Sequence, residues 1–173
     1  MKSGIALAVC LAAVYIATIG AQQSAVTGRT DAPQQVSPNT AVFSVDHSAF
    51  TRYGLDLSAD AIRTGSAGAT FVDYGTYKLQ LSERTASGGA EVHAHWDDVM
   101  MVQAGSATLI TGGTVVDGKT GADGETRGLR IEGGRSQALA PGDMVTVRAG
   151  TPHQILVPSK TIYRALVIKI HEP

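Results

Sequence analysis

From residue 68 onward, hydrophobic and polar residues alternate in short segments that are separated by Gly, Pro, Asp and Ser. Side chains alternate between the two faces of a β-strand, so this period-two pattern predicts strands with one buried face. Many short strands at regular spacing favour a two-sheet sandwich or barrel. The clearest segments read TYKLQLSERT, DVMMVQAG, SATLITGG, MVTVRAG and TIYRALVIKI.

Two stretches of the chain depart from this pattern. Residues 45–62 have weak helical spacing, with Asp46 and Ser58 as candidate N-caps, and predict one short helix or two. Residues 114–134 are rich in glycine and charge, and predict a long excursion from the barrel with one short strand. The chain is therefore predicted to be all-β, with a short N-terminal helical segment.

The N-terminus has the pattern of an export signal. Lys2 precedes an apolar run over 4–21, and the residues after it are small and polar, which is typical of a secretory signal peptide. We expect residues 1–21 to be the signal peptide, 22–42 a flexible linker and 43–173 the folded domain, in a secreted or periplasmic protein. An uncleaved membrane anchor is the alternative, because an apolar run of this length is at the lower limit for crossing a bilayer.

Composition and charge argue against nucleic-acid binding and against a metal site built from cysteine. A chain of 173 residues with a net charge of −1 fits one domain with a sizeable core, and it has no basic surface that would favour nucleic acid. The single cysteine, Cys10, lies within the apolar N-terminal run, so the mature chain would have no thiolate to bind a metal. No membrane association is expected once the signal is removed.

Three histidines stand at positions that indicate a metal site. His93 and His95 are two residues apart on a predicted strand, so both side chains would point to one face. Neutral imidazole is a common ligand of Zn, Fe, Ni, Mn and Cu ions. His153 comes later in the chain, directly after the turn–strand–turn segment GDMVTVRAGTP.

The first histidine pair resembles the first motif of the cupin superfamily. That motif is HxH, three or four residues, an acidic residue, six residues and then Gly. His93 and His95 match the HxH pair, and Asp98 is followed after six residues by Gly105. Two departures are that the acid is Asp instead of Glu and that it comes only two residues after His95.

The segment that ends at the third histidine resembles the second cupin motif, which is Gly, five residues, PxG, two residues and His. Gly142 is followed by five residues, by the segment 148–150 and, after two more residues, by His153. Arg148 stands where the family has proline, and Val157 where it usually has asparagine.

Two neighbouring aspartates compete for the acidic position of the first motif. Counting back six residues from Gly105 selects Asp98, which would share the inner face of its strand with Met100 and Val102. Because Asp is one methylene shorter than Glu, Asp98 either binds the metal, hydrogen-bonds a ligand histidine or metal-bound water, or is only a turn residue. Asp97 is expected to be a turn or surface residue.

Glu91 is a candidate catalytic residue. It has the same strand parity as His93 and His95, and would line the same cavity. A carboxylate held near a metal in an apolar barrel could act as a general base. The alternative is an ordinary charge at the end of a strand.

The resemblance implies an all-β, cupin-like jelly-roll β-barrel with one divalent metal ion, Fe, Mn, Ni or Zn, held by His93, His95, Asp98 and His153. It implies a metal-dependent enzyme of the dioxygenase, isomerase, epimerase or lyase type, with a small-molecule substrate. Two alternatives stay open: a binding module for a small molecule or carbohydrate with a structural metal, and a structural or storage barrel with a vestigial site. Small cupins often pair, so a homodimer is also expected.

Overall fold

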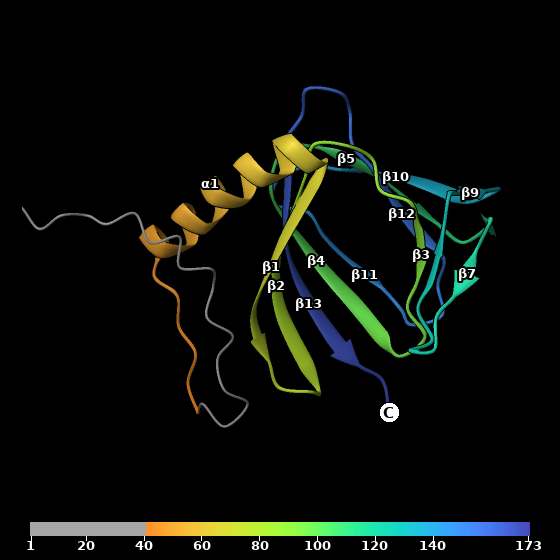
Figure 1. Ribbon diagram of the computed structural model, residues 1–173, viewed down its shortest axis with the longest axis horizontal. Coiled ribbons are helices and arrows are strands. Elements are labelled where there is room, and N and C mark those ends of the chain that lie inside the picture. The colour runs from red at the N-terminus through yellow and green to blue at the C-terminus, as the bar shows by residue number, and fades with distance from the viewer. Residues whose placement is uncertain (1–40) are drawn as a thin grey trace, which may run out of the picture.

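The computed structural model describes residues 41–173 of the chain (Figure 1). The predicted signal peptide, residues 1–21, and residues 22–40 of the predicted linker lie outside the described residues. Within 41–173, no helix is both long and apolar enough to cross a membrane.

One helix and a series of short strands make up the described part of the chain. The helix α1 spans His47–Thr64 and precedes every strand of residues 41–173. The strands, in chain order, are β1 Ser66–Asp73, β2 Tyr77–Arg84, β3 Ala90–Val92, β4 Trp96–Ala104, β5 Ala107–Thr111, β6 Thr114–Val116, β7 Lys119–Thr120, β8 Thr126–Gly128, β9 Arg130–Glu132, β10 Arg135–Leu139, β11 Met144–Val147, β12 His153–Leu156 and β13 Tyr163–His171.

The strands form two main sheets that face each other (Figure 1). One sheet has the order β1-β2-β13-β4-β11 and the other β10-β5-β12-β3-β8-β7, while β6 and β9 form a two-stranded ribbon. Every paired set of described strands is antiparallel. The prediction of an all-β, cupin-like jelly-roll barrel with an N-terminal helical segment is confirmed.

Buried apolar side chains fill the space between the two sheets, and β4 shows the alternation that puts them there. Asp98, Met100 and Val102 are buried on its inner face, whereas Met101 and Gln103 are exposed. This agrees with the face predicted for the strand. The rest of this core comprises Ala107, Leu109, Leu139, Val147, Ile155, Val157, Tyr163, Ala165 and Val167.

The helix α1 begins at a cap that was predicted from the sequence. The Asp46 side chain accepts a hydrogen bond of 2.8 Å from the Ala49 N–H, which satisfies a backbone donor that the helix leaves free. The helix is capped at its other end by Gly65, whose φ of 89° is a left-handed conformation that glycine adopts readily. One helix therefore covers the whole region, and the second N-cap candidate, Ser58, lies inside it.

A second apolar core lies between α1 and the outer face of β1 and β2. The Phe71 ring contacts the rings of Phe43, Phe50 and Tyr53, with centroids 5.4 to 6.2 Å apart. Leu57, Val72 and Leu81 are buried in the same cluster. Full burial of a large apolar side chain contributes about 1.5–3 kcal/mol, so these contacts fasten α1 to the sheet.

Beneath α1, a buried ion pair joins β2 to β13. Glu83 is fully buried, and Arg164 Nε donates a hydrogen bond of 2.8 Å to its Oε2 atom. The Ser58 hydroxyl, on α1, donates to the other carboxylate oxygen of Glu83. A Cβ atom at Gly54 would lie 2.5 Å from Arg164 Cζ, so a larger residue there would push the guanidinium away from the helix.

Residues 114–134 contain more regular structure than the sequence predicts. They form β6, β7, β8 and β9 instead of one short strand. None of the residues in these strands is buried, so they leave no alternating hydrophobic pattern in the sequence. Because β8 pairs with β3, the excursion lies beside the strand that carries Glu91.

Replacement of Arg164 by methionine should lower the free energy of unfolding by about 3 kcal/mol, because the buried Glu83 carboxylate then loses its counter-charge. Urea denaturation followed by circular dichroism measures this loss. The double variant Arg164→Met/Glu83→Gln is the matched control, since it removes both charges and should recover much of the lost stability. Equal urea midpoints for Arg164→Met and the parent would show that the ion pair adds nothing to stability.

Candidate metal centre

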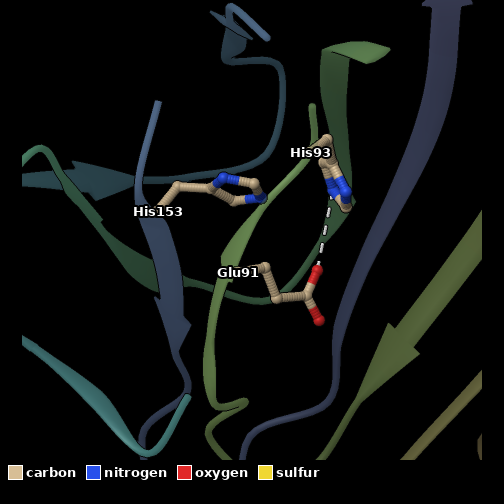
Figure 2. A group of neighbouring side chains, drawn as sticks. All are labelled: Glu91, His93 and His153. Atoms are coloured by element: carbon tan, nitrogen blue, oxygen red, sulfur yellow. Dashed lines mark ion pairs between the residues drawn. The ribbon is translucent and has the colours of Figure 1, made fainter. Parts of the chain in front are cut away.

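Three side chains from one sheet converge at the inner surface of the barrel (Figure 2). Glu91 lies on β3, His93 follows that strand, and His153 is the first residue of β12, where it pairs with Glu91. Each offers one ligand atom within 4.8 Å of the other two. Both histidines are buried and Glu91 is partly exposed. These three residues could hold a metal ion.

Asp98 approaches the same cluster from β4 in the opposite sheet. Its Oδ2 atom lies 3.2 Å from His93 Nε2 and 3.8 Å from His153 Nε2. Its Oδ1 atom accepts a hydrogen bond of 2.5 Å from the Lys169 ammonium group. Burial acts to raise the pKa of Asp98, but the His93 and Lys169 contacts outweigh it and hold the pKa below its usual value. The carboxylate is therefore charged, with one oxygen turned toward both imidazoles.

Hydrogen bonding determines which nitrogen of His153 is free. Its Nδ1 atom lies 3.1 Å from the Thr151 carbonyl oxygen, which can only accept, so Nδ1 carries the proton. Burial, together with the nearby charge of His93, holds the pKa of His153 below its usual value. The ring is therefore neutral, and Nε2 presents a lone pair to the cluster.

His93 is held on its other side by Glu125. Its Nδ1 donates a hydrogen bond to Glu125 Oε2, while its Nε2 faces Asp98 and lies 3.7 Å from Glu91 Oε2. Burial acts to lower the pKa of His93, but the carboxylates of Asp98 and Glu125 outweigh it and raise the pKa. A carboxylate on the far nitrogen of a ligand histidine fixes the orientation of the ring and makes it a stronger ligand.

Glu125 was not among the residues predicted from the sequence, because it lies in the 114–134 excursion outside both motifs. Strand pairing brings it to the site. Val92 on β3 pairs with Thr126 on β8, so the residue before Thr126 stands opposite His93. Only knowledge that β3 pairs with β8 could have revealed it.

The structure does not bring His95 to the cluster. His93 is buried whereas His95 is exposed, so the two side chains do not share a face as expected. His95 stacks on His171 with ring centroids 6.0 Å apart, and His171 meets Trp96 edge-on at 4.7 Å. The expected alternation fails because β3 ends at Val92 and the chain bends before β4 begins at Trp96.

This geometry shifts the first motif by two residues. Glu91 and His93 occupy the places of the HxH pair, and the four residues between His93 and Asp98 match the family spacing. Six residues then lead to Gly105, where φ is 70° and a Cβ atom would lie 2.1 Å from the Ile162 carbonyl oxygen. The chain thus has Glu91 in the place of the first histidine of the cupin motif. Asp98 then follows His93 at the spacing that the motif requires.

Asp97 connects the first motif segment to the second by a hydrogen bond and an ion pair. The prediction that it is a turn or surface residue was wrong. It is buried, and it accepts a hydrogen bond of 2.7 Å from the Ala149 N–H, which is the main cause of its lowered pKa. Arg148, which replaces the family proline, forms an ion pair of 2.8 Å with the same carboxylate. The Gly150 N–H then donates to the His93 carbonyl oxygen at 2.8 Å.

The cluster opens into a cavity of about 150 Å³ between the two sheets. The polar part of its wall comes from alternate residues of β2 and from both ends of β13: Gln80, Ser82, Arg84, Tyr163 and Lys169. The apolar part comprises Met100, Ile155, Ala165 and Val167. A cavity of this size can hold a small organic molecule.

Comparison with known proteins found no matching family model and no matching curated protein. Among solved structures, the polyketide cyclase RemF from Streptomyces resistomycificus is 20% identical over 63% of this chain and 68% of its own, with a TM-score of 0.44. A cupin superfamily protein from Desulfitobacterium hafniense is 17% identical over 61% of this chain and 76% of its own, with a TM-score of 0.42. A predicted oxalate decarboxylase from Thermotoga maritima is 12% identical over 61% and 80%, with a TM-score of 0.46.

The fold assignment rests on features of this chain itself. Two antiparallel sheets face each other across a cavity, and residues of both motif segments line that cavity. On these features the chain is a cupin-fold protein.

Proposed function

We propose that this chain is a metal-binding cupin that acts as a metal-dependent enzyme on a small-molecule substrate. One observation carries the proposal: Glu91, His93 and His153 offer ligand atoms within 4.8 Å of one another, beside a cavity between the sheets. The Nε2 atom of His153 carries no proton and turns its lone pair toward this cluster, where a metal ion would bind it. The secreted or periplasmic location expected from residues 1–21 is part of the proposal.

The chemistry of the donor set fits a divalent transition metal. Glu91, His93 and His153 would hold the ion, with Asp98 Oδ2 as a further oxygen donor. Two histidines with a carboxylate are typical of non-haem iron, and additional carboxylate oxygen suits iron or manganese. Among the four expected metals, this set therefore favours Fe(II) and Mn(II). A bound ion would supply Lewis-acid polarisation of the substrate.

The protein's own groups orient such a site. The Glu125 carboxylate and the Thr151 carbonyl oxygen each accept the Nδ1 proton of one histidine, so both Nε2 atoms are directed into the cluster. Lys169 holds one oxygen of Asp98 and leaves the other beside the imidazoles. The apolar cavity wall excludes water from one side of the substrate.

A non-catalytic binding module for a small molecule is the second candidate, and Lys169 is the observation that favours it. Its ammonium group already neutralises Asp98 at 2.5 Å, so the cavity contains a cation without any metal ion. In this case the histidines and carboxylates would bind the ligand by hydrogen bonds alone.

Elemental analysis of protein purified without chelator tests the proposal. The parent should contain stoichiometric iron or manganese, and His153→Ala should contain none, because the variant lacks the Nε2 lone pair. His95→Ala is the matched control, since it removes an exposed histidine outside the cluster and should keep the metal. A parent that stays metal-free after reconstitution with Fe(II), Mn(II), Ni(II) and Zn(II) would favour the binding module.

Glu125→Ala should weaken metal affinity by about 10-fold to 100-fold, because His93 loses the carboxylate that orients its ring. Competition against a chelating fluorescent indicator measures the affinity. Glu132→Gln provides the control, as an exposed acidic residue of the same excursion. Equal affinities for Glu125→Ala and Glu132→Gln would mean that Glu125 does not support a ligand.

Substitution of the adjacent aspartates should affect metal affinity at one position and stability at the other. Asp98→Asn should weaken metal affinity, because its Oδ2 faces both imidazoles. Asp97→Asn should instead lower the free energy of unfolding by about 1–3 kcal/mol, because it weakens the bonds to Ala149 and Arg148. Metal titration and urea denaturation of both variants distinguish these effects, and the reverse assignment would show that Asp97 serves the metal.

A further inference from the structure

Arg84 lines the cavity without a counter-ion. It is half-buried on the inner face of β2, and within residues 41–173 no hydrogen bond or ion pair involves its side chain. Lys169, the lysine of the cavity wall, is paired with Asp98. A guanidinium group keeps its charge at neutral pH and has five N–H donors in a planar fork. Leaving these donors unused in a partly enclosed space is unfavourable, so the position favours an anion.

Tyr163 presents a second unused donor beside Arg84. The two residues are direct partners across β2 and β13, and both line the cavity. Tyr163 is 2% exposed, and its hydroxyl is buried without a hydrogen-bond partner in the described part of the chain. Buried hydroxyl groups nearly always have a partner. Burial also raises the pKa of Tyr163, so the hydroxyl keeps its proton and can donate it to an acceptor.

Gly88 provides the space in which the Arg84 guanidinium lies. A Cβ atom at Gly88 would lie 2.7 Å from Arg84 Nη1 and 3.2 Å from Cζ. Gly88 is not among the glycines with positive φ, so space and not backbone conformation accounts for a glycine here. Arg84 lines the same cavity as Glu91, His93 and His153, so one ligand in that cavity can contact both the guanidinium and the metal cluster.

We propose that Arg84 and Tyr163 form a carboxylate subsite, and that the ligand is a small monocarboxylic acid whose other end reaches Glu91, His93 and His153. Arginine can donate two parallel N–H groups to a carboxylate, and the Tyr163 hydroxyl supplies a further donor. The apolar wall between the two ends fits an apolar middle section. A cavity of about 150 Å³ holds a benzene-sized group, which limits the acid to roughly ten non-hydrogen atoms.

The subsite deepens the proposed function by naming the class of substrate, and it rests on that proposal for the chemistry at the far end. Binding of the carboxylate itself requires no metal ion. The two ideas can therefore fail separately, and the test measures them separately.

Benzoate and hexanoate are suitable probes, with their neutral amides benzamide and hexanamide as controls of matched shape. Binding is measured by isothermal titration calorimetry on protein stripped with a chelator, so that the carboxylate cannot bind a metal instead. At least one acid should bind, and its amide should bind at least about 10-fold more weakly, because it lacks the charge that pairs with Arg84. Failure of both acids to bind, or equal binding of acid and amide, overturns the proposal.

Arg84→Met should weaken binding of the acid at least about 10-fold, and Gly88→Ala should weaken it by displacing the guanidinium. Arg135→Met is the matched control, because Arg135 is an exposed arginine outside the cavity, and it should bind like the parent. An acid affinity that is the same in Arg84→Met and the parent contradicts the subsite.

Tyr163→Phe should weaken acid binding several-fold without lowering the thermal midpoint of the ligand-free protein, because its hydroxyl has no partner to lose. A midpoint several degrees lower would show a structural role for the hydroxyl and remove Tyr163 from the subsite. Elemental analysis of each preparation, made before the chelator treatment and again after reconstitution with metal, separates the two proposals. Metal without Arg84-dependent binding refutes the subsite, whereas Arg84-dependent binding in a parent that takes up no metal refutes only the metal-dependent function.

Discussion

The Asp97 carboxylate holds the two motif segments in one arrangement, and the geometry of the candidate site depends on it. Asp97 accepts a hydrogen bond from the 148–150 turn, and the same turn donates one to the His93 carbonyl oxygen. His153 begins the strand that follows this turn, so the separation of the two histidines is set by the turn. Asp98 is the next residue on β4, so the same contact also sets how far its carboxylate reaches toward the imidazoles. The ligand geometry is therefore a property of the fold as well as of the ligands.

The interior of the barrel is organised by pairing of charges. Asp98 lies between His93 and Lys169, and His93 is shared between Asp98 and Glu125. Each of these groups would be costly to bury alone, and each contact lowers the cost of the others. Arg84 takes part in none of these ion pairs. Its position on the cavity wall therefore indicates that it binds a ligand and does not have a structural role alone.

Several features of the site could be predicted from the sequence, and the failures have definite physical causes. The spacing back from Gly105 identified Asp98 correctly as the inward-facing acid, because alternation holds from Asp98 to Gln103 of β4. The same argument failed for His95, because β3 ends at Val92 and alternation does not continue through a bend. The role of Glu125 could not be predicted from the sequence, because its position depends on long-range strand pairing that leaves no local pattern.

Glu83 and Arg84 are neighbours on β2 and face opposite sides of the sheet. A strand that slips by one residue exchanges its two faces, so a mispaired β2 would place Arg84 beneath the helix and Glu83 in the cavity. Glu83 is stabilised only where Arg164 and Ser58 contact it. The polar contacts beneath α1 therefore favour the native register of β2 over a register shifted by one residue in either direction, and so keep the arginine on the cavity side.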